Sequence, residues 1–115
     1  MAISEAYSGS ETVSTTEHSL TTDTAGPDAD TTDGIYQVFI DFNALVAGDQ
    51  YQVRVYEKVL SSSTQRIVDE WTINGPLSAP VWVSPCLILI HGWDITIDKI
   101  AGADAAIDWS IRKVA

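Results

Sequence analysis

From residue 35 onward, apolar and polar residues alternate in short runs along the chain. In "IYQVFIDFN", residues 35 to 43, the residues Tyr36, Val38, Ile40 and Phe42 fall on one face. A period of two residues is typical of β-strands, because successive side chains point to opposite faces of a sheet. Segments 51–59, 65–73, 93–98 and 107–112 show the same alternation. We therefore expect strands whose apolar faces pack into one core.

The apolar faces expected in these four segments are Tyr51, Val53, Val55 and Val59; Ile67, Trp71 and Ile73; Trp93, Ile95 and Ile97; and Ile107, Trp109 and Ile111. The sequence "AGADA", residues 101–105, predicts a hairpin turn between the last two segments. The run "VWVSPCLILI", residues 81–90, is apolar on both faces over its second half. Pro85 cannot donate a ladder hydrogen bond, so it predicts an edge, a bulge or a bend within this run.

The first third of the chain has a different composition. Residues 8–33 are rich in Ser, Thr, Asp and Gly, which favours extended, looped or partly ordered chain. We expect residues 1–33 to form a polar N-terminal arm, with a strand in "ETVSTTEHSL" and a long acidic loop after it. Residues 34–115 are then expected to form the folded domain.

The fold class follows from these segments. Polar connections separate them, and no stretch has the pattern of a long amphipathic helix. A chain of 115 residues is long enough for one hydrophobic core. We predict an all-β protein, a β-sandwich or jelly roll of about seven to eight antiparallel strands.

Charge narrows the range of partners. Six Lys and Arg stand against 16 Asp and Glu, giving a formal net charge of −10. This argues against binding a nucleic-acid backbone or an anionic membrane, because both require clustered cations. The longest apolar run, "CLILI", is too short to span a bilayer, and the opening residues lack the pattern of a signal peptide. We expect no nucleic acid and no membrane as partners, and folding in a cytoplasm.

The sequence "LILIHGWD", residues 87–94, raises the question of an enzyme, because α/β-hydrolases often place His-Gly after a buried strand. That fold needs strands alternating with helices and a nucleophile in a Gly-x-Ser-x-Gly turn, and the sequence contains neither. We therefore expect no catalytic residues and no enzymatic activity. Gly92 is expected to permit a tight bend between two strands, with His91 at that bend.

Metal and cofactor sites are also not expected. In the acidic loop "DTAGPDADTTDG", Asp23, Asp28, Asp30 and Asp33 offer oxygen ligands, but their spacing does not match an EF-hand. A solvated loop is the expectation, and the sequence leaves calcium binding by another loop geometry open. His18 and His91 are far apart in sequence, and Cys86 is expected to be a buried structural thiol. We predict no metal and no cofactor.

The tryptophans divide into two groups. Trp71, Trp93 and Trp109 lie on apolar faces and are expected in the core. Tyr56 and Trp82 lie on the less apolar faces of their strands, so they are candidates for an exposed or interface aromatic. Exposed aromatics of this kind stack on sugar rings in many β-sandwich modules.

Three stretches carry a more particular likeness: "MAISEAYSGSETVSTTEHSL" (1–20), "GIYQVFIDFNALVAGDQYQVRVYEKV" (34–59) and "LILIHGWDITIDKIAGADAAIDWSIRKV" (87–114). Together they resemble small all-β virion proteins of tailed bacteriophages. The resemblance implies a head decoration or cement protein that stabilises the capsid, assembled in the host cytoplasm. Its implied partners are the major capsid protein and further copies of itself, with a trimer as the expected oligomer.

For such a role we expect partner contacts at Tyr7, Leu20, Tyr56 and Trp82. The alternative hypothesis is a carbohydrate-binding module, or a receptor-binding module of the fibre or tail type. In that case Trp82 would belong to an exposed aromatic platform.

Overall fold

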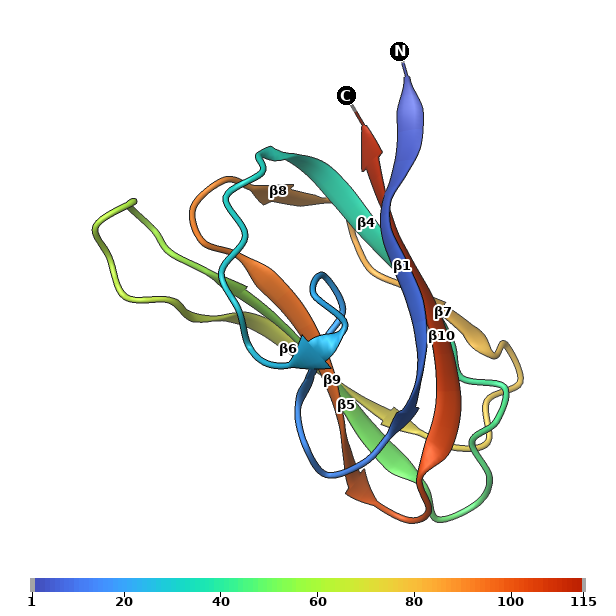
Figure 1. The fold of residues 1–115 in the computed structure, drawn as a ribbon. Coiled ribbons are helices and arrows are strands. Elements are labelled where there is room, and N and C mark those ends of the chain that lie inside the picture. The colour runs from blue at the N-terminus through green and yellow to red at the C-terminus, as the bar shows by residue number, and fades with distance from the viewer. Residues whose placement is uncertain (1, 115) are drawn as a thin grey trace.

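The computed structural model describes residues 2–114, which form two five-stranded antiparallel sheets packed face to face (Figure 1). The strands are β1 (Ile3–Val13), β2 (His18–Ser19), β3 (Thr24–Ala25), β4 (Gly34–Asp41), β5 (Gln50–Glu57), β6 (Arg66–Asn74), β7 (Val81–Val83), β8 (Leu87–Leu89), β9 (Asp94–Ala101) and β10 (Ala105–Val114). The all-β prediction is confirmed. Among the described residues, no helix has the length and apolar character needed to span a membrane.

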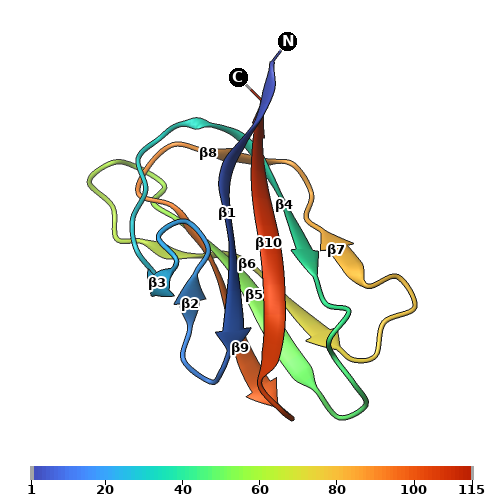
Figure 2. The same ribbon diagram turned by 45° about the vertical axis from the view of Figure 1, so that its right-hand side comes forward.

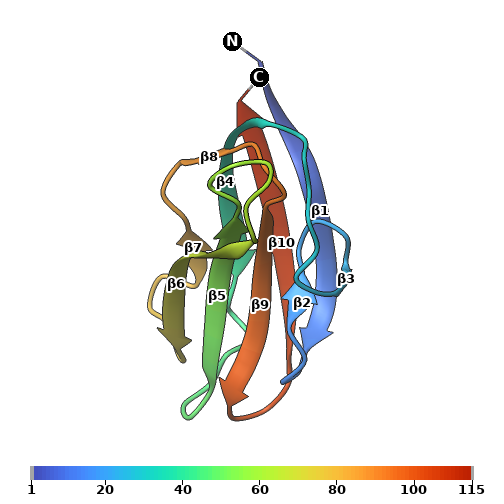
Figure 3. The same ribbon diagram turned by 90° about the vertical axis from the view of Figure 1, so that its left-hand side faces the viewer.

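Strand pairing is nested along the chain. In the first sheet the order is β1-β10-β4-β7, with β8 also paired to β4, and in the second it is β3-β2-β9-β5-β6 (Figures 2 and 3). The first long strand therefore pairs with the last, β2 pairs with β9, β4 pairs with β7 and β8, and β5 pairs with β6. This nesting of two Greek keys defines the jelly roll, one of the two predicted architectures.

The predicted hairpin at residues 101–105 is wrong. Strand β9 lies in the second sheet between β2 and β5, whereas β10 lies in the first between β1 and β4. The connection crosses from one sheet to the other over the end of the core. Gly102 has φ +91° there, and the Ala103 N–H donates to Asp49 Oδ1 at 3.0 Å. Alternation alone cannot distinguish a hairpin from a crossing of this kind, because both join two strands by a short polar loop.

Most of the predicted apolar faces form the core between the sheets. Its buried members are Val13, Leu20, Tyr36, Val38, Ile40, Phe42, Leu45, Tyr51, Val53, Val55, Ile73, Leu89, Trp93, Ile95, Ile97, Ala105, Ile107, Trp109 and Ile111. Two predicted members are exposed. Val59 lies beyond the end of β5, and Ile67 lies beyond a break in the β5–β6 register where Val55 pairs Asp69 but Tyr56 pairs Ile67. The break inserts Val68 and shifts the alternation of β6 by one residue.

The apolar run 81–90 forms two short strands along one side of β4. Ser84 lies between them, with its N–H donating to the Val38 carbonyl and its hydroxyl accepting from the Val38 N–H, both at 3.0 Å. Pro85 follows, as expected for a residue that interrupts a strand. Cys86 is exposed, so the prediction of a buried thiol is wrong. The reason is that β7 and β8 form the margin of a sheet whose outer face meets solvent.

Strands from residues 2–33 belong to both sheets, which differs from the expected polar arm. Strand β1 pairs with β10 along its length, and β2 and β3 complete the second sheet. Val13 and Leu20 are each 1% exposed within the shared core. Few apolar residues are needed for this packing, because Ser and Thr suit the solvent-facing positions of a strand.

Candidate functional site

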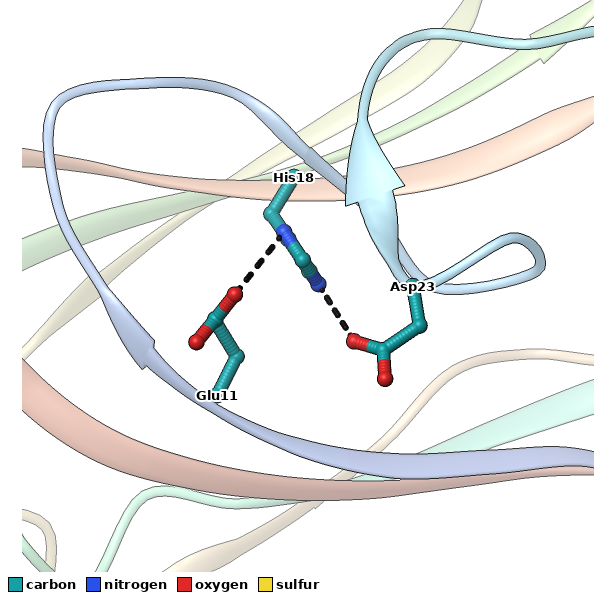
Figure 4. A group of neighbouring side chains, drawn as sticks. All are labelled: Glu11, His18 and Asp23. Atoms are coloured by element: carbon teal, nitrogen blue, oxygen red, sulfur yellow. Dashed lines mark hydrogen bonds and ion pairs between the residues drawn. The ribbon is translucent and has the colours of Figure 1, made fainter.

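A histidine and two carboxylates converge where the chain passes from the first sheet to the second (Figure 4). Glu11 comes from β1, His18 from β2, and Asp23 from the turn between β2 and β3. Asp23 Oδ1 lies 2.8 Å from His18 Nε2, and Glu11 Oε2 lies 3.5 Å from His18 Nδ1. One ligand atom from each residue lies within 4.8 Å of the other two. We call these three residues the carboxylate–histidine cluster.

The imidazole packs against Trp109 on one side and borders a surface depression on the other. His18 is 7% exposed, and its ring meets the Trp109 indole edge to face with ring centroids 5.5 Å apart. The Trp109 N–H donates to the Leu20 carbonyl at 2.9 Å, which fixes the indole. Beyond the ring lies a surface depression of about 260 Å³, also lined by Thr12, Ser14, Thr16 and Thr24. The side chains of Glu11 and Asp23 are about half exposed at its rim.

The sequence did not reveal this cluster. His18 and Asp23 are five residues apart, a spacing that could have suggested contact across a turn, but Glu11 reaches them only through the crossing between sheets. Two of the other loop aspartates are engaged elsewhere. Asp28 accepts a hydrogen bond from the Thr22 hydroxyl at 2.6 Å, and Asp30 accepts one from the Tyr7 hydroxyl. Within residues 2–114, no second group of three such side chains converges.

A second feature is a row of apolar side chains on the outer face of the first sheet. Ile3 pairs with Val114, Val114 with Ile35, and Ile35 with Ile88, so the row crosses β1, β10, β4 and β8. Directly paired residues point to the same face of a sheet. Ile3, Ile35 and Ile88 are 70%, 42% and 80% exposed. We call these four residues the apolar row.

A groove of about 220 Å³ runs beside the apolar row. Cys86, Phe39 and Arg112 line it together with Ile3, Ile35 and Val114. The Arg112 guanidinium lies over the Phe39 ring, 3.8 Å from its centroid. This part of a strongly acidic chain therefore presents apolar surface next to a cation.

Two of the residues predicted to bind a partner lie in or near the core. Leu20 is 1% exposed, so in this conformation it cannot contact a partner, and that prediction is wrong. Its carbonyl instead holds the Trp109 indole. Tyr7 is half-buried, with its hydroxyl donating to Asp30 and its ring edge to face with Trp93 at 6.0 Å.

The two predicted surface aromatics are both half-buried and lie in different sheets. Trp82 on β7 packs against Trp71 on β6, with ring centroids 5.1 Å apart. Tyr56 on β5 donates its hydroxyl proton to Glu17, which also lies 3.6 Å from Arg54. Trp82 and Tyr56 are therefore not brought together into one platform, and their role as partner contacts stays a prediction.

The two hydrogen-bonded tyrosines predict a loss of stability at alkaline pH. Burial, together with the hydrogen bond to Asp30, raises the pKa of Tyr7 to about 12. Burial and the bond to Glu17 likewise raise the pKa of Tyr56 to about 12. In the unfolded chain a tyrosine has a pKa of about 10. The stabilisation is therefore complete below about pH 10 and is lost as the pH rises toward 12.

We expect the free energy of unfolding to fall between these pH values, measured by urea titration at each pH. In a variant carrying Tyr7→Phe and Tyr56→Phe the fall should be shallower. It should not vanish, because burial also raises the pKa of Tyr36 and Tyr51. An equal slope in both proteins would contradict the assignment.

The His-Gly bend at residues 91–92 is confirmed. Gly92 has φ +52°, a conformation that side chains disfavour, and its chain turns between β8 and β9. Glu57 holds the bend by accepting from the backbone N–H groups of Ile90 at 2.8 Å and His91 at 3.0 Å. These contacts explain the bend within "LILIHGWD" in structural terms. No family model matches the chain, and no curated protein shows significant similarity to it.

Proposed function

We propose that this protein is a non-enzymatic structural component of a tailed-phage virion that binds the capsid surface and stabilises the head. The apolar row is the observation that carries the proposal. Three isoleucines exposed in one row on the outer face of a sheet would cost free energy in water unless another surface covers them. The likeness of the sequence to small virion proteins supports a shell protein as that surface.

The sheet architecture is suited to contact with neighbours. Among the described residues, β1 pairs only with β10, so its other edge borders no strand. An edge of 11 residues can accept a strand from another subunit. We assign self-association to this edge, in a symmetric oligomer such as a trimer, and shell binding to the apolar row. Binding to the assembled shell would stabilise it through linkage.

The first test is the copy number in purified virions, by quantitative mass spectrometry against the major capsid protein. A ratio of one copy per shell subunit, or a simple fraction of it, supports a decoration protein. A handful of copies would move the protein to the neck, tail or fibre. Absence from particles overturns the proposal.

Cys86 provides a direct test of where the shell binds. It is the sole cysteine of the chain, it is exposed, and it lines the groove beside the apolar row. We expect an alkylating reagent to modify Cys86 quickly in the isolated protein and slowly in intact particles. Equal rates, in particles that contain the protein, would contradict binding through this face.

A substitution in the apolar row should separate binding from folding. Ile88→Ser changes a side chain that is 80% exposed, so the free energy of unfolding should change by no more than about 0.5 kcal/mol. Binding to empty capsids, measured by co-sedimentation, should weaken at least about tenfold, because the shell would bury the most exposed isoleucine of the row. The matched control is Val59→Ser, 85% exposed on the loop after β5, which should bind normally. Equal binding by both variants would contradict the assignment.

A further inference from the structure

We propose that the carboxylate–histidine cluster is a zinc site, with His18, Asp23 and Glu11 as ligands and water completing the coordination. One imidazole nitrogen and two carboxylate oxygens form a ligand set that zinc accepts, whereas calcium prefers oxygen ligands alone. The inference concerns metal binding and does not depend on the proposed virion role.

The three ligand atoms lie within 4.8 Å of one another, near enough to reach one ion after the exposed carboxylates adjust. Zinc bonds to nitrogen and oxygen are about 2.0–2.2 Å long, so two ligands on one tetrahedral ion lie roughly 3–4 Å apart. Asp23 Oδ1 lies 2.8 Å from His18 Nε2, so this half-exposed carboxylate would move slightly outward to admit an ion between them. Glu11 Oε2 lies 3.5 Å from the other ring nitrogen, Nδ1, too long for a good hydrogen bond, and the half-exposed Glu11 side chain would turn to reach an ion bound at Nε2.

Preorganisation favours the imidazole as the anchor of the site. The His18 side chain is 9% exposed and packed against Trp109, so little rotational freedom is left to lose on binding. Both carboxylates lie at the rim of the 260 Å³ depression, which leaves room for water on the ion. Only small movements of exposed side chains are needed to close the coordination.

Charge also favours a divalent cation. In the ion pairs formed by the described residues, Glu11 and Asp23 have no partner other than His18. The depression therefore holds two carboxylates that form no ion pair with a Lys or Arg. A zinc ion would neutralise them and would join β1 to the β2–β3 turn.

The test is titration of chelator-treated protein with ZnSO₄ by isothermal calorimetry at neutral pH. We expect one zinc ion per chain, binding at least tenfold more weakly in Asp23→Asn and in Glu11→Gln. Both variants preserve side-chain shape, and asparagine tolerates the φ of +56° at position 23. They should therefore fold even where substitution of the buried His18 fails. The matched control is His91→Gln, which removes the other histidine and should bind normally.

An independent readout is Co²⁺, whose visible absorption reports a nitrogen and oxygen coordination sphere. The spectrum should appear with the wild type and with His91→Gln, and should be lost in Asp23→Asn. Zinc binding that is equal in all variants would place the site elsewhere. No binding at millimolar zinc would mean that the cluster is only an ion pair. Either result overturns the proposal.

Discussion

Replacement of Asp94 by alanine is expected to lower the free energy of unfolding by about 4 kcal/mol, since buried donors would lose their acceptor. Asp94 is 0% exposed. Its Oδ1 accepts hydrogen bonds from the Ser19 hydroxyl at 3.0 Å and the Thr21 hydroxyl at 2.8 Å. It also accepts one from the backbone N–H of the next residue, Ile95, at 2.8 Å. Its Oδ2 accepts from the Asp28 N–H at 2.7 Å.

These bonds attach the segment from Ser19 to Asp28 to the outer face of β9. Burial raises the pKa of the Asp94 carboxyl, while the hydrogen bonds from Asp28, Ser19 and Thr21 favour its charged form. Alanine would leave backbone and hydroxyl donors buried without partners, each costing about 1–3 kcal/mol if water cannot reach it. Because water can reach some of these donors, the expected loss of about 4 kcal/mol is smaller than the sum of the separate costs.

The measurement is urea unfolding followed by circular dichroism, with the slope checked for two-state behaviour. Asp94→Asn is a useful second variant. Its side-chain oxygen can accept from the three donors at Oδ1, but its amide nitrogen cannot accept from the Asp28 N–H. The free energy of unfolding of Asp94→Asn should lie between those of the wild type and Asp94→Ala. The exposed Asp69→Asn should change stability little. A loss below 1 kcal/mol for Asp94→Ala would contradict the role given to this carboxylate.

Replacement of the neighbouring Trp93 by alanine is expected to cost about 3–5 kcal/mol, the range for a large aromatic removed from a core. Trp93 is 0% exposed and packs against the Tyr36 ring with centroids 4.5 Å apart. Its indole N–H donates to the Thr32 carbonyl at 3.0 Å. Its backbone exchanges two hydrogen bonds with Asp30, at 2.7 and 2.8 Å.

Unfolding in guanidinium chloride measures this loss of stability. Two further variants provide comparisons. Trp93→Phe should retain much of the packing and lose only the bond to Thr32, so its cost should be clearly smaller. Trp82→Ala removes a half-buried tryptophan that contacts Trp71 at the sheet margin. If Trp93→Ala proves no more destabilising than Trp82→Ala, then Trp93 is not the centre of this core.

The inner faces of the long strands were predictable, because a period of two residues records which side chains a sheet buries. The outer faces were not. Asp94 and Thr96 alternate with buried isoleucines as solvent-facing residues would, yet both are 0% exposed. The segment holding Glu17, Ser19 and Thr21 covers them with hydrogen-bond partners. Local alternation contains no information about a distant polar segment of this kind.

The candidate sites show the same limit. Glu11 and His18 meet only because the chain crosses between sheets at residues 14–17, and sequence separation gave no sign of it. The apolar row was hidden for a similar reason: Ile3, Ile35, Ile88 and Val114 come from four strands, and each looks unremarkable within its own segment. By contrast, the bend at Gly92 was predictable, since glycine after an apolar run is itself a local signal.

The pairing of β1 with β10 has a consequence for synthesis of the protein. Strand β1 leaves the ribosome before the other strands, but its neighbour in the sheet consists of residues 105–114, which are made after all of them. The same residues separate β1 from β4, so the first sheet has a gap at its centre until residues 105–114 have been synthesised. Folding of the first sheet therefore waits for residues 105–114, whereas the β5–β6 pair can form before they are made.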